Sequence, residues 1–333
     1  MGFLYPDNKN RASRVNQLCS DTAHLQTQIK EAIEDAKTQD KRAVEILDKI
    51  AKQRGYRTLN EYLEDARKKL SPEDRKKYED LKRELEAKDE GLDIAMKLAT
   101  GVAGIGFLCK AGPILIKVIF NRNLVNIALR AVGVALLRII TGNLSEGQAL
   151  LSSISKFLSS ALKTENLTSK FAVSMIKYLK VAGKVLTILG VAFDAVFLIY
   201  EIVDGAKQRA EFQKAIKDLC VRRFSVKKIQ QYTRVTLSFA SDGSTIASLA
   251  QTLQEVVNSG TLTQEQADEA VAKKMRELEP KITKAIDDVN DNSVHKMLAE
   301  QDKESNIAWT NEDPSLLEIL KMLEEDKNDK SKE

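Results

Sequence analysis

The chain has 333 residues, of which 43% are hydrophobic and 30% are charged, and this balance excludes a generally disordered protein. It contains only 15 Gly and 5 Pro residues, so few positions interrupt helices and long helices are favoured over many short strands. Aromatic residues make up 5% of the chain, which is low for a β-sandwich or β-barrel. We therefore predict an all-α fold, an elongated bundle of long amphipathic helices that encloses a hydrophobic helical hairpin.

Residues 1–97 are expected to form an N-terminal helical arm. Apolar residues recur at helical spacing from Val15 to Arg54, interrupted by a polar joint between residues 36 and 44, and Gly55 predicts the end of this stretch. Thr58 with Glu61 has the pattern of a capping box and predicts a second helix. The run that begins "SPEDRKK" at residue 71 predicts a third, strongly charged helix that buries only a narrow seam.

Residues 98–204 form an apolar block with a different character. Residues 98–109 carry no charge, and the cations that follow are separated by apolar runs. From Ala95 to Gly205 twelve Lys and Arg residues face five Asp and Glu residues, so the apolar block is also the basic part of the chain. Such a segment suits an anionic membrane surface, although lysines that merely keep a hydrophobic helix in water would give the same count.

A second apolar stretch, residues 185–200, is interrupted only by Asp194. A helix that is apolar on every face is buried either in protein or in lipid. A spanning helix needs about 20 mostly apolar residues, whereas the longest uncharged run here has twelve, and an acid in the middle of a span is costly. A constitutive membrane protein is therefore disfavoured.

Residues 205–300 are expected to form a C-terminal helical arm, which resembles the first arm in pattern and is long enough to pack against it. The sequence "SDGS" at residues 241–244 predicts a turn with a new helix start, and Pro280 predicts a break or kink. Residues 301–333 are acidic and polar, and we expect a tail that is partly disordered.

Catalytic and ligand-binding signatures are missing from the sequence. His24 and His295 have no partners at the spacing of a metal or catalytic site, and the three cysteines form no redox or metal motif. The sequence "GVAGIG" at residues 101–106 lacks the Lys and Ser or Thr of a phosphate-binding loop. The basic patch "VRRFSVKK" at residues 221–228 is not interleaved with aromatics as in nucleic-acid binding. We predict no enzyme activity, no cofactor, no metal and no nucleic-acid partner.

Two interpretations of the apolar block remain. It is either the ordinary core of an intracellular helical scaffold or regulatory protein, or a pair of helices hidden in the folded chain that later enters a bilayer. The second interpretation accounts for both the apolarity and its interruption by cations.

The layout of helical arm, apolar block and helical arm resembles the α-helical pore-forming toxins of the cytolysin A and haemolysin BL type. The resemblance implies a bundle that inserts a hydrophobic hairpin into a lipid membrane, anionic membranes being favoured, as a homo-oligomer or with a partner subunit. Three sets of residues are the candidates for this function. The bend and close packing are assigned to Gly101, Gly104, Gly106, Gly112 and Pro113; lipid contact to Phe107, Ile114, Leu115, Ile119, Phe193, Phe197 and Leu198; and headgroup contact to Lys110, Lys117, Lys177, Lys180 and Lys184.

The first thirty residues contain no apolar region of the secretory type. We expect a protein that is cytoplasmic or released by a non-classical route before it meets a membrane.

Overall fold

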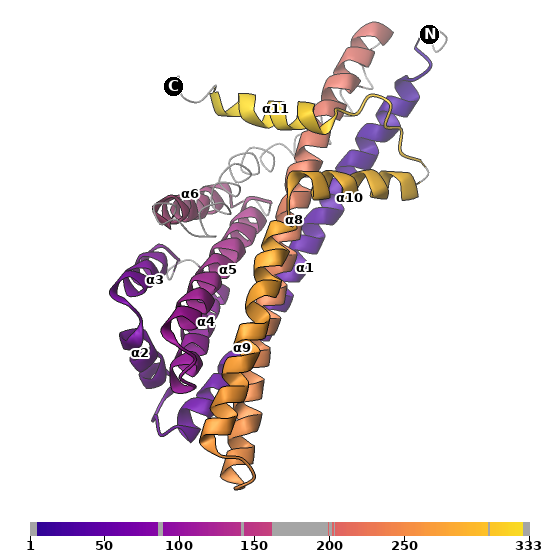
Figure 1. Cartoon of the computed structure of the whole chain (residues 1–333). Helices are drawn as coiled ribbons and strands as arrows, with labels where there is room; N and C mark the ends of the chain where they lie inside the picture. Colours follow the sequence, from indigo (N-terminus) through magenta and orange to yellow (C-terminus); the bar gives the residue numbers. More distant parts are fainter. Residues whose placement is uncertain are drawn as a thin grey trace.

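The computed structural model describes residues 5–85, 89–140, 143–161, 199, 202, 204–305 and 307–328. All regular structure in these residues is helical, which confirms the prediction of an all-α fold (Figure 1). The helices are α1 (Asn8–Gln53), α2 (Leu59–Lys69), α3 (Pro72–Leu85), α4 (Glu90–Leu108), α5 (Pro113–Ile140), α6 (Leu144–Ala161), α8 (Gly205–Asn258), α9 (Gln264–Asp287), α10 (Asp291–Glu304) and α11 (Leu316–Asn328).

The two longest helices, α1 and α8, lie side by side along most of their length (Figure 1). At a rise of about 1.5 Å per residue they extend roughly 70 and 80 Å. α9 folds back along α8, and α4 and α5 lie against the same long pair with α2, α3 and α6 outside them. The apolar faces of all these helices join in one core, and a smaller core lies between the N-terminal parts of α1 and α8.

α1 runs without interruption from Asn8 to Gln53 and includes the polar joint between residues 36 and 44. Asp40, which lies in that joint, is fully buried. Its side chain forms an ion pair with Arg130 of α5. The helical stripe therefore looks broken in the sequence because one of its inward positions carries a charge instead of a hydrocarbon.

α8 likewise runs straight through residues 241–244, so the turn expected at "SDGS" is wrong. A Cβ on Gly243 would lie 3.2 Å from Leu98 Cδ2 in α4, and Asp242 forms an ion pair with Arg122 in α5. These residue types resemble a turn, but they serve to bring α4 and α5 close to α8. α9 also continues past Pro280 to Asp287.

The short helices of the N-terminal arm begin at the caps that their sequence predicts. The Thr58 hydroxyl accepts a hydrogen bond from the Glu61 amide at 3.1 Å, and the Ser71 hydroxyl accepts one from the Asp74 amide at 3.1 Å. Gly55 has a φ of +86° where the chain leaves α1, a conformation that glycine adopts without strain. The apolar helix α4 begins at Glu90 because the Asp89 carboxylate caps its first amides.

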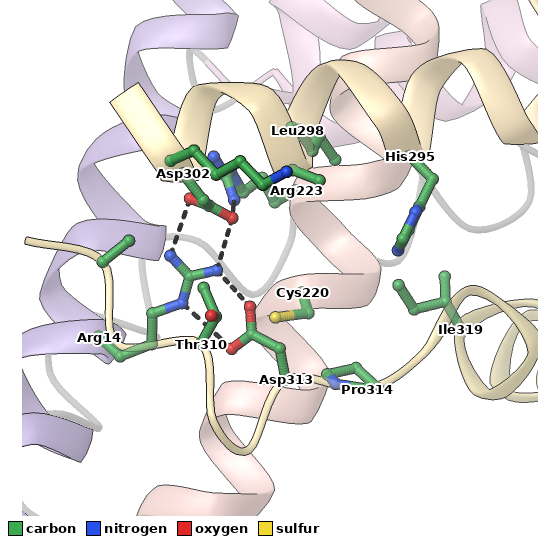
Figure 2. Close-up of a pocket in the computed structure, with 13 residues that line it drawn as sticks. Arg14, Cys220, Arg223, His295, Leu298, Asp302, Thr310, Asp313, Pro314 and Ile319 are labelled. Carbon is green, nitrogen blue, oxygen red and sulfur yellow. Dashed lines mark hydrogen bonds and ion pairs between the residues drawn. The ribbon is translucent and has the colours of Figure 1, made fainter. Parts of the chain in front are cut away.

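The region after residue 300 contains helix α11, whose Ile319 and Leu323 are buried in the main core. The sequence analysis did not anticipate this helix within the acidic tail. α10, α11 and the segment between them are fastened to α1 and α8 by a set of ion pairs that we call the C-terminal clasp (Figure 2). Its members are Arg11, Arg14 and Arg223 on the long helices and Asp302, Glu312 and Asp313 on the C-terminal part.

Asp302 is the centre of the clasp. Its carboxylate accepts two hydrogen bonds of 2.9 Å from Arg14 and one of 2.8 Å from Arg223 (Figure 2). Burial would raise the pKa of Asp302, but the hydrogen bonds from the two arginines outweigh burial, and the pKa lies below its ordinary value. The clasp therefore stabilises the fold when the Asp302 carboxyl is ionised.

We expect Asp302→Asn to lower the free energy of unfolding at neutral pH by about 2 kcal/mol, because hydrogen bonds to a charged acceptor are lost. A carboxyl with a depressed pKa stabilises the fold above its unfolded pKa, and this stabilisation is lost as the pH falls through the folded pKa. The difference in Tm between wild type and variant should thus shrink as the pH is lowered from about 6 to about 3. Glu300→Gln, at an exposed position of the same helix, is the control and should change Tm little at any pH. A difference that is constant over this range would contradict the role of the Asp302 charge.

Candidate functional site: an enclosed helical hairpin

α4 and α5 form a helical hairpin with a short turn at residues 109–112. The Ala111 amide donates a 2.9 Å hydrogen bond to the Gly106 carbonyl, which closes the end of α4 in the manner of a Schellman motif. Gly112 has a φ of +88° and Lys110 a φ of +48°, and Pro113 then begins α5. The sequence-predicted bend at Gly112 and Pro113 therefore coincides with the turn of the hairpin.

α4 is buried on every side over residues 98–106. Helices α1, α2, α5, α8 and α9 surround it. Close approach depends on two glycines: a Cβ on Gly104 would lie 2.5 Å from the Tyr62 hydroxyl of α2, and a Cβ on Gly101 would overlap Leu47 of α1. The Tyr62 hydroxyl donates a 2.7 Å hydrogen bond to the Gly101 carbonyl, and burial raises the pKa of Tyr62 well above its usual range.

α5 carries four cations and no Asp or Glu. Each cation lies within ion-pair distance of a carboxylate from another part of the chain. The pairs are Lys117 with Glu73 of α3 at 3.5 Å, Arg122 with Asp242 of α8 at 3.0 Å, Arg130 with Asp40 of α1, and Arg138 with Asp89 at 3.8 Å and with Glu146 of α6 at 3.6 Å. The four cations of α5 are thus points at which the hairpin is attached to the rest of the chain.

The pair of Arg130 with Asp40 is the most deeply buried of these contacts. The side chains are 4% and 0% exposed, and Arg130 Nη2 donates to Asp40 Oδ1 at 3.1 Å. A buried ion pair adds little net stability, because desolvation opposes the attraction, but removing one partner leaves an uncompensated charge. The pair therefore specifies where α5 lies on α1 more than it stabilises the fold.

The pairs at Lys117 and Arg122 differ in electrostatic environment. A hydrogen bond from Lys77, with a further contribution from Lys117, lowers the pKa of Glu73. Burial raises the pKa of Asp242 although Arg122 opposes the shift. Of these carboxylates, Asp242 is accordingly the one that is poorly solvated, and Glu73 the one held in its charged state.

The tip of the hairpin exposes one large apolar side chain. Ile114 is 81% exposed and lies between Lys110, which is exposed, and Lys117, which is 43% exposed. The other candidates for lipid contact in this part lie inside: Leu115 and Ile119 are buried and Phe107 is half-buried. A Cβ on Gly106 would meet Ile116 of α5 at 3.1 Å.

The remaining candidates, Phe193, Phe197, Leu198, Lys177, Lys180 and Lys184, lie outside the described residues. Sequence reasoning missed the residues that hold the hairpin, notably Asp40, Tyr62 and Asp242. A charge at an inward helical position was the available signal for Asp40, but no sequence pattern shows which cation faces it.

A cavity of about 420 Å³ lies beside the C-terminal clasp, between α1, α8, α10 and the segment that leads to α11. Arg14, Asp302, Asp313 and His295 line it (Figure 2). Arg14 forms ion pairs with both Asp302 and Asp313, so these three charged groups of the cavity wall belong to the C-terminal clasp. Within the described ranges no group of three or more His, Cys, Asp or Glu side chains has the geometry to hold a metal ion.

Comparison of the chain with protein-family models, with curated proteins and with solved structures gives no match, so the function is argued from the hairpin itself. By length and composition, α4 over Glu90–Leu108 and α5 over Pro113–Ala135 are each long and apolar enough to cross a membrane. In the folded chain 67% and 75% of their most apolar windows are buried. The core helices of proteins that never enter a bilayer meet the same criterion.

Removing the carboxylate from the Arg130 pair should destabilise the fold strongly. We expect Asp40→Ala to lower the free energy of unfolding by about 3–5 kcal/mol, because Arg130 is left buried and unpaired. In an Arg130→Met background, where no charge needs a partner, the same substitution should cost much less. Chemical denaturation of the two single variants and the double variant measures the coupling, and strictly additive losses would contradict it.

Proposed function

We propose that this chain is a membrane-inserting, pore-forming protein in which the α4–α5 hairpin leaves its enclosure and enters a lipid bilayer. The observation that carries the proposal is the distribution of charge on the hairpin. α4 is free of charge from Leu98 onward, α5 bears only cations, and each of these cations is neutralised by a carboxylate from elsewhere in the chain. To leave its enclosure the hairpin breaks these ion pairs and the Tyr62 hydrogen bond, and it exchanges apolar contacts with protein for apolar contacts with lipid.

The dimensions support the same proposal. α4 has 19 residues and α5 has 28, against the roughly 20 that a spanning helix needs. Two helices from one chain cannot surround a water-filled lumen, so a pore requires several copies. Oligomerisation is therefore part of the proposal.

The tip supplies the first contact with the membrane. Lys110 and Lys117 are attracted by anionic headgroups, each contributing about 1 kcal/mol near such a surface. Ile114 between them offers an apolar side chain that is already exposed. An exposed isoleucine flanked by lysines suits an anionic interface better than it suits water.

The alternative is a helical scaffold or regulatory protein that uses α4 and α5 as ordinary core. Their deep burial is what such a protein also needs. The two functions differ in their response to lipid, because a scaffold has no reason to bind anionic vesicles.

The exposed tip allows a test that leaves the folded chain intact. We expect wild-type protein to release dye from anionic liposomes, and Ile114→Glu to reduce the release at least about 10-fold. The added carboxylate is repelled by anionic headgroups and must cross the hydrocarbon core as the tip inserts, where an acid costs about 2.5–3.5 kcal/mol. Ile307→Glu is the matched control, since Ile307 is 75% exposed but lies outside the hairpin, and it should release dye like wild type. Equal thermal stability of the two variants verifies the folds. Absence of dye release and of vesicle binding by wild-type protein would favour the scaffold.

A reversible cross-link provides a second, independent prediction. Glu73 and Lys117 are 49% and 43% exposed and connect α3 to α5, whereas Cys19, Cys109 and Cys220 are buried. A Glu73→Cys/Lys117→Cys variant joined by a reducible bifunctional thiol reagent should be inactive on liposomes and regain activity on reduction. The control is Asp65→Cys/Lys69→Cys, a pair within α2, which should stay active when cross-linked. Full activity of the α3–α5 cross-linked form would contradict release of the hairpin.

A further inference from the structure

A polar stripe runs along the buried face of α5. Arg122, Asn126 and Arg130 are spaced four residues apart and share one face of the helix. All three are turned toward the interior: the side chains of Arg122 and Arg130 are 11% and 4% exposed, and Asn126 is 6% exposed. Over the same stretch the opposite face is apolar, with Leu124, Ala128, Ala131 and Ala135.

Stability of the folded chain does not explain this stripe. The Oδ1 atom of Asn126 and the Nε atom of Arg130 are buried without a hydrogen-bond partner among the described residues. A buried polar atom without a partner costs about 1–3 kcal/mol, and apolar side chains at these positions would avoid that cost. Polar groups that remain unsatisfied in a core call for another role.

The spacing of the cations along α5 matches a bilayer. Lys117 and Arg138 are separated by about 31 Å at the helical rise, which is close to the roughly 30 Å of a hydrocarbon core. In an inserted helix these two cations reach opposite headgroup layers. Arg122 and Arg130 then lie within the hydrocarbon thickness, where a charge is tolerated only if it faces protein or water.

We infer that the pore selects anions, and that Arg122, Asn126 and Arg130 line its lumen. This inference rests on the proposed function. Three of the carboxylates that neutralise α5 in the folded chain, Glu73, Asp40 and Asp242, belong to α3, α1 and α8 and remain behind when the hairpin leaves. From Glu90 to Ile140 the hairpin contains six cations and only two carboxylates, and both carboxylates lie at the start of α4. Rings of Arg or Lys in a pore favour anions.

The experiment measures reversal potentials in planar bilayers under a KCl gradient. Wild-type pores should pass chloride in preference to potassium, by at least about 3-fold. Two charge-removing variants also remove the carboxylate that faces each arginine, so that no buried charge is left unpaired: Arg122→Gln/Asp242→Asn and Arg130→Gln/Asp40→Asn. Each should bring the ratio of chloride to potassium permeability closer to one, by about 2-fold.

The control is Arg67→Gln/Glu79→Gln, which removes an ion pair of 3.2 Å between α2 and α3, outside the hairpin, and should leave the selectivity unchanged. Circular dichroism and thermal unfolding verify that each variant is folded. Conducting pores that prefer potassium, or whose preference for chloride is the same in all variants, would overturn the inference while the proposed function stands. Absence of conductance from wild-type protein would overturn both.

Discussion

The position of α5 depends on the ion pair between Arg130 and Asp40, because both side chains are removed from water and each is the charge that balances the other. Either charge would be costly to bury without its partner, so α5 lies on α1 in one register. Apolar side chains around them are less selective, since hydrophobic contact is non-directional. The more exposed ion pairs of Lys117, Arg122 and Arg138 hold the rest of α5 against α3, α8 and the start of α4.

Close packing around α4 depends on a different constraint. Gly101 and Gly104 leave space for Leu47 and Tyr62, and the Tyr62 hydroxyl bonds to the backbone of α4. The same small residues would let neighbouring helices approach one another in lipid, where association depends on packing. A hairpin with this composition can therefore pack both in the core of the folded chain and in lipid. The charges on α5 have different partners in these two environments.

The described part of the chain contains two separate sets of ion pairs between distant segments. The pairs on α5 hold the hairpin, whereas the C-terminal clasp around Asp302 holds α10 and α11 on α1 and α8 (Figure 2). The clasp joins residues almost 300 positions apart in sequence, so it connects the first turns of α1 to α10 and to the segment before α11. The two sets share no residue, and each can be altered by itself.

The sequence by itself determined the helical class, the caps at Thr58 and Ser71, the turn at Gly112 and the apolar, cationic character of residues 98–140. These features follow from local propensity, from capping chemistry and from composition, which act within a few residues. Only the tertiary structure decided that Asp40 and the "SDGS" segment lie inside unbroken helices. It also decided that part of the acidic tail forms α11, which packs on the main core. A buried charge and a surface charge look alike in a sequence, because the difference lies in a partner that folding brings from a distant position. Asp40 finds Arg130, and Asp242 finds Arg122, only when the long helices have packed.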